Sequence, residues 1–236
     1  MALHSLRFEA VGYRYPDGHT ALAGIRFALR PGEKAAVVGA NGAGKSTLLL
    51  HTAGLLLPTE GRLYVDGIPV LKKTRTQIRQ RVGYLFQQPD DQLFLPTVHD
   101  DVAFGPSNMG LRRAEIEQRV DEALAAVGAA ELRNRTPARL SVGQKKRVAI
   151  ATLLAMRPSL LVLDEPTASL DPRARRQLLE LLATLPQTAL IATHDLDFAR
   201  THCSRVLLLQ HGRLVADGPA AELLDDRTLL HASELL

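Results

Sequence analysis

The sequence is poor in cysteine and in long apolar runs. Its single cysteine, Cys203, excludes an internal disulfide framework and indicates a reducing compartment. The longest apolar stretch, 48–57, is interrupted by polar residues and a glycine, and it is far shorter than the about 20 apolar residues that cross a bilayer. Residues 1–15 lack a basic start followed by an apolar core, so no signal peptide is expected. These absences predict a soluble chain without a transmembrane segment, which reaches a membrane only through a partner.

Charge is not concentrated anywhere along the chain. Lys and Arg number 29 and Asp and Glu number 25, for a formal net charge of +4, and the basic residues form no arm or tail. A phosphate-rich ligand, an anionic membrane surface and ordinary variation all fit this mild excess. The 236 residues, 46% of them hydrophobic, suffice for one large domain or for one domain with an inserted part. No internal repeat, linker or low-complexity tract is visible.

Short apolar strands alternate with helical patterns, which favours an α/β fold with a mainly parallel sheet. Residues 4–30 alternate as antiparallel strands do, and Asp66-Gly67 is a typical hairpin turn. From 100 to 155 the apolar spacing becomes that of one helical face, and Gly128 is placed to end a helix. Further strands are expected at 35–38, 82–86, 160–163, 189–192 and 206–209, and helices at 45–56, from 141 to 155 and from 171 onward.

Residues 39–46, Gly-Ala-Asn-Gly-Ala-Gly-Lys-Ser, match the phosphate-binding pattern G-x-x-x-x-G-K-[ST]. The glycines let the backbone wrap closely enough for successive N–H groups to point at phosphates, Lys45 adds a cation, and Ser46 offers a hydroxyl to Mg²⁺. The pattern lies between an expected strand and a helix whose positive end faces the same anion. The candidate ATP-binding residues are Gly39, Ala40, Asn41, Gly42, Ala43, Gly44, Lys45, Ser46 and Thr47.

The strand expected at 160–163 delivers two carboxylates, Asp164 and Glu165, at its carboxyl end, where α/β sheets bind ligands. Asp164 is placed to hold Mg²⁺ through water, and Glu165 to orient or deprotonate the attacking water. An isolated Asp-Glu pair commonly caps the next helix. Beside a phosphate-binding loop, the catalytic interpretation is favoured.

Residues 140–144, Leu-Ser-Val-Gly-Gln, have Ser141 and Gln144 at capping-box spacing, so a helix is expected to begin here. Three basic residues at 145–147 then crowd the positive end of that helix, which costs a few tenths of a kcal/mol. An anion at that end would offset this cost.

In this order, the motifs resemble the nucleotide-binding domain of ABC transporters, over nearly the whole chain. The resemblance implies the ABC ATPase fold. In it, 1–99 and 156–236 form a RecA-like P-loop core with an N-terminal antiparallel β part, and 100–155 form an inserted helical subdomain. Residues 39–47 are similar to the Walker A motif, and Asp164-Glu165 to Walker B with its catalytic glutamate.

Residues 140–144 resemble the LSGGQ signature, which is found only in ABC ATPases and acts on ATP held by a second subunit. Val142 stands where the family usually has its first glycine. As the first helical residue it has a negative φ, which a β-branched side chain accepts. Gly143 is intact, so a functional signature is expected. The implied signature residues are Ser141, Val142, Gly143 and Gln144.

Other roles follow from the resemblance alone. Tyr15 resembles the aromatic residue that stacks on adenine. Gln87 resembles the Q-loop glutamine, and His194 the switch histidine that contacts the γ-phosphate. Ser169 and Asp171 resemble the D-loop. The implied catalytic residues are Glu165, His194 and Gln87, and the implied Mg²⁺ ligands are Ser46, Gln87 and Asp164.

Residues 86–94 and 101–111 narrow the resemblance to energy-coupling-factor importers, especially the ATPases of cobalt and nickel uptake systems. This implies an ATP-bridged homodimer, integral membrane transport subunits as partners and a peripheral position on the cytoplasmic face of the membrane. No nucleic acid partner is expected. Leu93 and Phe94 are expected to form a groove for a partner's helices, with burial in the chain's own core as the alternative.

Three other functions compete with metal import. The first is a vitamin importer, often built on two different ATPases. The second is an ABC ATPase of DNA maintenance, which would have a long heptad coiled coil between Ser46 and Leu140, and none is visible. The third is an ABC translation factor, which carries two tandem cassettes, whereas this sequence has one phosphate-binding loop.

Overall fold

The computed structural model describes residues 4–233 and 235. The described residues form two compact units, one within 1–82, 159–165 and 186–236 and one within 83–158 and 166–185. The units are groups of residues in mutual contact, so the subdomain boundaries predicted at 100 and 155 stay a prediction.

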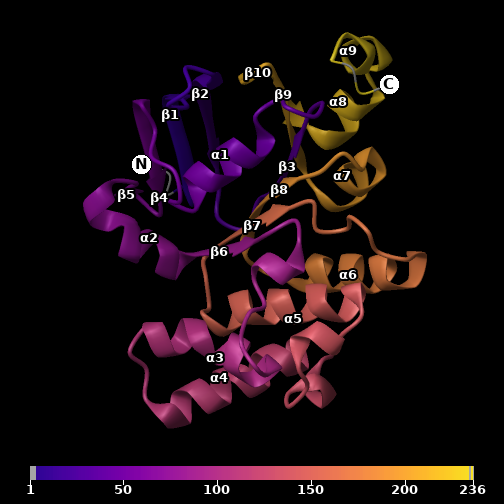
Figure 1. Ribbon diagram of the computed structural model, residues 1–236. Helices are drawn as coiled ribbons and strands as arrows, with labels where there is room; N and C mark the ends of the chain where they lie inside the picture. Colours follow the sequence, from indigo (N-terminus) through magenta and orange to yellow (C-terminus); the bar gives the residue numbers. More distant parts are fainter. Residues whose placement is uncertain (1–3, 234, 236) are drawn as a thin grey trace. The chain divides into compact units, whose positions relative to one another are not determined.

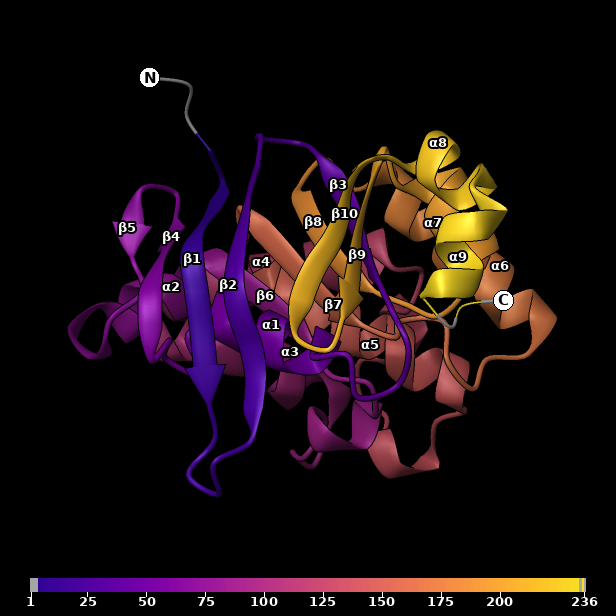
Figure 2. The same cartoon turned by 90° about the horizontal axis from the view of Figure 1, so that it is seen from above.

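An antiparallel sheet forms one part of the first unit, with the strand order β2-β1-β4-β5 (Figures 1 and 2). Leu6 pairs with Leu29 and Phe8 with Phe27, and the two phenylalanine rings stack with centroids 4.6 Å apart. The predictions of antiparallel strands over 4–30 and of a hairpin at Asp66-Gly67 are confirmed. The strands are β1 (Leu6–Arg14), β2 (Thr20–Leu29), β4 (Glu60–Val65) and β5 (Ile68–Pro69).

The second sheet of this unit has the order β10-β9-β3-β8-β7. Its strands are β3 (Lys34–Val38), β7 (Leu160–Asp164), β8 (Thr188–Ala192), β9 (Arg205–Gln210) and β10 (Arg213–Pro219). The first four are parallel, as predicted, so their carboxyl ends lie at one edge. β10 is antiparallel to β9 and was not predicted, because it has no fully buried face and therefore no apolar alternation.

The helices of the first unit are short. They are α1 (Lys45–Thr52), α2 (Arg75–Arg81), α7 (Leu196–His202), α8 (Ala220–Asp225) and α9 (Arg227–Ala232), with the 3₁₀ turn η1 (Lys72–Thr74). The helix predicted to reach residue 56 ends at Thr52 instead. Gly54, with a φ of 66°, adopts a left-handed conformation that stops it. Among the described residues, no helix combines the length and the apolar character that a membrane span requires.

The second unit is mainly helical, and α3, α4 and α5 pack against one another in it (Figure 1). α5 begins after its cap Ser141 and α6 after its cap Asp171, as predicted. α4 ends just before Gly128, whose φ is 61°. The helices are α3 (Val98–Asn108), α4 (Arg113–Ala126), α5 (Val142–Ala155) and α6 (Pro172–Thr184), with the 3₁₀ turns η2 (Pro89–Asp91), η3 (Ala130–Leu132) and η4 (Pro137–Arg139). Strand β6 (Val82–Leu85) leads from the first unit into this one.

Candidate active site

The phosphate-binding pattern forms the loop between β3 and α1. β3 is buried along most of its length, and α1 begins at Lys45, directly after Gly44. Gly44 has a φ of 105°, and a Cβ at this position would lie 2.6 Å from the carbonyl oxygen of Ala21. Glycine is required here, because it tolerates the left-handed conformation and carries no Cβ. The strand, loop and helix that the pattern needs are therefore all present.

Lys45 lies inside this loop. Its Nζ donates to the carbonyl oxygens of Gly39, at 2.7 Å, and Ala40, at 3.1 Å. Burial lowers the pKa of Lys45, and the nearby carboxylates of Glu165 and Asp164 partly oppose that effect. A cation held in a glycine-rich loop at a helix N-terminus is suited to a phosphate. Of the remaining loop residues, Asn41, Gly42 and Ser46 are exposed, and Ala43 and Thr47 are buried.

Two buried carboxylates stand at the end of β7. Asp164 is the last residue of the strand, and Glu165 follows it with a φ of 47°, which is uncommon for a residue other than glycine. The N–H of Glu165 donates to the carbonyl oxygen of Ala192, at the end of β8, at 3.0 Å. This bond ties two neighbouring strand ends together and holds Glu165 in its strained conformation.

His194 follows β8 and contacts Glu165. The distance from its Nδ1 to Oε2 of Glu165 is 2.8 Å, and its backbone N–H donates to the same oxygen at 3.4 Å. The side chain of His194 is 72% exposed and that of Glu165 is 10% exposed. This distance is that of a hydrogen bond between the imidazole and the carboxyl group. The family resemblance predicts that His194 contacts a phosphate, and the sequence does not reveal its contact with Glu165, because the pairing of β7 with β8 brings the two residues together.

Tyr15 lies beside the phosphate-binding loop. Its hydroxyl is 3.1 Å from Oγ1 of Thr47, in α1. Its half-buried ring meets the ring of Tyr13 edge-on, with centroids 4.9 Å apart. Tyr13 in turn meets His51 edge-on, so both tyrosines contact α1.

In the second unit, the predicted signature caps α5 as expected. Oγ of Ser141 accepts from the N–H of Gln144 at 3.3 Å, and Oε1 of Gln144 accepts from the N–H of Ser141 at 3.0 Å. Val142 is the first helical residue and is 44% exposed, so its side chain meets no steric obstacle. A Cβ on Gly143 would lie 2.8 Å from Cβ of Ala174 in α6. This position therefore needs a glycine, whereas position 142 does not.

A polar cavity of about 340 Å³ lies where α5 and α6 begin. Oδ1 of Asp171 accepts from the N–H groups of Arg173 and Ala174 at 2.9 Å each, so its charge is used in capping α6. The positive ends of two helices thus meet at one cavity, which favours an anion. Ser169, with a φ of 63°, belongs to the turn before α6. The lining residues are Ser141, Gly143, Gln144, Arg147, Asp171, Arg173, Ala174 and Gln177.

The three basic residues after the signature are each paired within this unit. Lys145 binds Asp90, Lys146 binds the carbonyl oxygen of Gln87, and Arg147 binds that of Gly128. These contacts offset the crowding that the sequence suggested.

Arg173 and Gln177, which line the cavity, were not predicted from the sequence. The sequence feature that could have identified them is their position just after the D-loop, within the first two turns of α6.

The apolar segment near Gln87 divides between core and surface. Leu93 is 7% exposed and is part of the core, whereas Phe94 is 63% and Phe104 47% exposed. The two exposed rings meet edge-on with centroids 5.3 Å apart. Gln87 itself is exposed.

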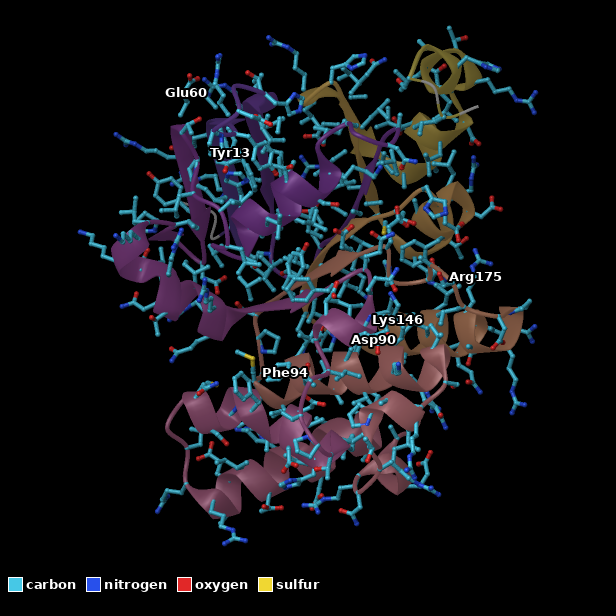
Figure 3. All side chains as sticks on the ribbon, in the orientation of Figure 1. Tyr13, Glu60, Asp90, Phe94, Lys146 and Arg175 are labelled. Carbon is cyan, nitrogen blue, oxygen red and sulfur yellow. The ribbon has the colours of Figure 1, made fainter. Side chains whose placement is uncertain are left out.

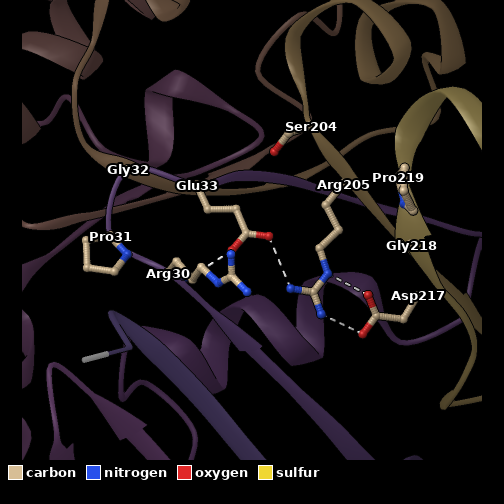
Figure 4. A pocket seen from close by; sticks show the side chains of 9 residues that line it. All are labelled: Arg30, Pro31, Gly32, Glu33, Ser204, Arg205, Asp217, Gly218 and Pro219. Carbon is tan, nitrogen blue, oxygen red and sulfur yellow. Dashed lines mark hydrogen bonds and ion pairs between the residues drawn. The ribbon is translucent and has the colours of Figure 1, made fainter. Parts of the chain in front are cut away.

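A second, larger hollow, of about 740 Å³, opens in the first unit where β3 and β9 begin (Figure 4). Arg205 binds both carboxylate oxygens of Asp217, at 2.6 and 2.8 Å, and also Glu33, at 3.1 Å. Since parallel strands begin at this edge, it is opposite to the edge that carries Asp164. The charges of Arg205 are satisfied by its neighbours, so this hollow carries no catalytic assignment.

The loop, the buried lysine and the two carboxylates at strand ends define a P-loop nucleotide hydrolase, and comparison with known proteins gives the family. The family model described as ABC transporter matches residues 22–168. The energy-coupling factor transporter ATP-binding protein EcfA of Methanocaldococcus jannaschii is 46% identical over 228 residues, which cover 94% of this chain and 82% of that protein.

Solved structures agree in fold. The structure of cbiO1 from Clostridium perfringens, described as part of the ABC transporter complex cbiONQ, has a TM-score of 0.87 and 40% identity, covering 99% of this chain and 95% of the other. A dimeric ATP-binding cassette in a post-hydrolysis state, bound to ADP and Pi, has a TM-score of 0.81 and 29% identity, covering 91% of this chain and 98% of the other. The chain belongs to the ABC transporter family and is an ABC-type ATPase. The predicted fold and the resemblance to energy-coupling-factor ATPases are confirmed.

Proposed function

We propose that the chain powers an energy-coupling-factor importer that takes up a small solute, cobalt or nickel ions first among them. It acts as a peripheral subunit on the cytoplasmic face of the membrane, bound to integral membrane partners. The observation that carries the ATPase part is the buried Glu165, held 2.8 Å from His194 beside the Lys45 loop. Support for the transport part is the similarity to EcfA and to cbiO1, the latter described as part of a transporter complex.

Two copies of the chain enclose two ATP molecules head to tail. Each copy carries one phosphate-binding loop in its first unit and one signature cavity in its second. The loop of one copy and the cavity of the other supply complementary halves of an ATP site. The loop offers Lys45 and a helix N-terminus, and the cavity offers the positive ends of α5 and α6. The similarity to a dimeric cassette bound to ADP and Pi supports this assembly.

Within each site, the residues divide into binding and chemistry. Lys45 and the loop 39–47 bind the phosphates, and Tyr15 stacks on the adenine. The cavity that Ser141 and Gly143 line binds the γ-phosphate of the ATP on the partner copy, with Ser169 and Asp171 beside it. These assignments follow from the P-loop pattern and from the family resemblance.

The donor set fits Mg²⁺. Ser46 exposes a hydroxyl at the start of α1, and Asp164 places a carboxylate near Lys45. Gln87, a residue of the second unit, is a further ligand that the family resemblance implies. Oxygen donors of this kind are the ones Mg²⁺ prefers. When bound, Mg²⁺ neutralises charge on the β- and γ-phosphates.

Glu165 is the general base of hydrolysis. Its carboxylate accepts a proton from the attacking water, which is thereby oriented toward the γ-phosphate. His194 holds the carboxylate through Nδ1 and the backbone N–H. The imidazole is exposed on its other side, so Nε2 is available to a phosphate oxygen.

The membrane partner docks on the exposed pair Phe94 and Phe104. Two aromatic rings that meet on an open surface suit the apolar face of a short amphipathic helix. Leu93, which is buried in the core, stabilises the loop and does not itself face the partner.

The docking surface is tested by Phe94→Asp, with Leu71→Asp as the control. Leu71 is also an exposed apolar side chain, at 44%, but it lies in the first unit. Phe94→Asp is expected to retain ATP hydrolysis by the purified subunit and to lose co-purification with membrane proteins, which mass spectrometry identifies. Leu71→Asp is expected to retain both. A Phe94→Asp subunit that still co-purifies with its membrane partners and supports uptake would contradict this docking site.

The solute is tested on the complex purified with those membrane proteins. Reconstituted into ATP-loaded vesicles, the complex is expected to accumulate labelled Co²⁺ or Ni²⁺, and the complex with Glu165→Gln is expected not to. Accumulation of a vitamin in place of either metal would favour the alternative importer.

A further inference from the structure

Lys146 is a charged side chain in the interior of the second unit. It lies in the second turn of α5, is 1% exposed and is among the largest fully buried side chains of the described residues. A lysine is almost never fully buried unless its ammonium is paired, because losing its hydration is costly. Its Nζ donates to the carbonyl oxygen of Gln87 at 2.6 Å. The backbone of Gln87 is therefore one partner of this buried cation.

The loop that follows β6 is attached to α5 at two further points. Lys145 binds Oδ1 of Asp90 at 2.5 Å. Nε2 of Gln92 donates to the carbonyl oxygen of Ala149 at 2.8 Å and to Oγ1 of Thr152 at 2.7 Å. Figure 3 labels Lys146, on α5, and Asp90, on the loop.

The three attachments differ in kind. Asp90 has a side chain that is 67% exposed, and an exposed ion pair contributes little to stability. Gln92 holds the far end of the loop. Of the three, Lys146 acts on Gln87 itself, through a part-buried, charge-assisted hydrogen bond, which is a stronger type than a bond between neutral groups.

We propose that Lys146 is a positioning residue for ATP hydrolysis, which joins the loop of Gln87 to the signature helix so that both respond together to ATP. The proposal rests on the proposed function, in which Gln87 contacts the ATP bound by its own chain and Ser141 contacts the ATP bound by the partner copy. Lys146 lies five residues after Ser141 on the same helix. A displacement of the loop is therefore passed to the signature, and the two ATP sites of the dimer are coupled.

The consequence is a separation of binding from turnover. ATP binding depends mainly on the loop at Lys45, which is part of the other unit. Removal of the ammonium leaves the carbonyl of Gln87 without its buried donor and frees the backbone that carries the glutamine side chain. Misplacement of a catalytic group by about 1 Å can cost about 100-fold in rate.

The test compares variants of the purified subunit. Lys146→Met keeps an unbranched side chain of similar length and removes the charge, and Lys146→Arg keeps a cation with N–H donors. Lys145→Met makes the same change at the neighbouring exposed pair. Val148→Ala loosens the same helix at a side chain that is 0% exposed. For each variant, kcat, KM for ATP, the Hill coefficient and the thermal unfolding midpoint are measured.

Lys146→Met is expected to lower kcat by about 10- to 100-fold, to change KM by less than about threefold, and to bring the Hill coefficient toward one, because the coupling between sites is lost. Lys146→Arg is expected to retain more of both kcat and cooperativity than Lys146→Met. Lys145→Met and Val148→Ala are expected to keep kcat within about threefold, although Val148→Ala lowers the unfolding midpoint.

Three results would overturn the proposal. They are an unchanged kcat and Hill coefficient in Lys146→Met, an equal loss in Lys145→Met, or an equal loss in a Val148→Ala variant of the same unfolding midpoint. If Lys146→Met is not recovered folded, Lys146→Gln replaces it, and equal turnover in Lys146→Gln and Lys146→Arg overturns the proposal. These measurements need no membrane protein, so their failure is distinct from a failure of the importer assignment.

Discussion

The close approach of α5 and α6 at Gly143 leads to a prediction whose size follows from the structure. A Cβ on Gly143 would lie 2.8 Å from Cβ of Ala174, whereas carbon atoms prefer about 3.5–4.0 Å. Gly143→Ala therefore forces the two helix starts apart by about 0.7 Å or more. Overpacking of this kind costs about 1–3 kcal/mol, and the helix preference of alanine over glycine returns about 1 kcal/mol. The expected net loss of stability is about 0–2 kcal/mol.

Because that net value spans zero, the decisive quantity is the coupling between the two positions. Ala174→Gly alone is expected to cost about 1 kcal/mol. In the double variant the overlap is gone, so the two changes are expected to be less damaging together than their sum by about 1–3 kcal/mol. Urea unfolding of the four proteins, followed by circular dichroism, gives this value. ATP turnover is expected to fall in Gly143→Ala, where Ser141 is displaced, and to recover in part in the double variant.

Additivity within about 0.5 kcal/mol would refute the reasoning, because it would mean that the two helices do not contact at this point. A loss of turnover that the double variant does not recover would show that the glycine serves the phosphate rather than the packing.

Three other changes give further tests. Val142→Gly removes an exposed side chain at the first helical position, so turnover should change by less than about tenfold, or about 1.4 kcal/mol of barrier, and a larger change measured in a steady-state assay would show a regulatory role. Glu165→Gln should bind ATP and lose most turnover, since an amide cannot accept the proton. Ultracentrifugation of this variant should find an ATP-dependent dimer. Hydrolysis near the wild-type rate would contradict the role of Glu165 as the base. Asp101 accepts the N–H groups of Phe94 and Leu95 through Oδ1, while its Oδ2 is buried with no partner among the described residues. Asp101→Ala should therefore cost about 2 kcal/mol, and Asp101→Asn should cost little or be stabilising. Burial raises the pKa of Asp101, so the stability of the wild type relative to Asp101→Asn should fall as pH rises above the ordinary carboxyl range, and urea unfolding at several pH values checks that sign.

The local motifs were predictable because each depends on neighbours in sequence. The capping box of Ser141 and Gln144 needs only a spacing of three residues, and the hairpin at Asp66-Gly67 needs only two turn residues. The start of α6 at Asp171 follows the same logic. Strand β10 escaped prediction because it is held by its pairing with β9 and has no fully buried face that would give its own residues an apolar alternation.

The apolar segment near Gln87 shows where a sequence pattern is insufficient. Leu93 and Phe94 are adjacent and both apolar, yet one is buried and the other is exposed. Hydrophobicity predicts that a side chain leaves water, and it does not distinguish the chain's own core from a partner's surface. Packing of the loop against the helices of its unit decides between the two.

The sequence by itself determined the class of this protein, because the phosphate-binding loop, the carboxylate pair and the signature are short patterns in a fixed order. Only the tertiary structure decided which groups meet. It placed His194 against Glu165, Lys146 against Gln87 and the starts of α5 and α6 at one cavity. The first two of these contacts join residues that are 29 and 59 positions apart in the sequence. Strand pairing and helix packing bring such residues together, and no local pattern in the sequence records the distance between them.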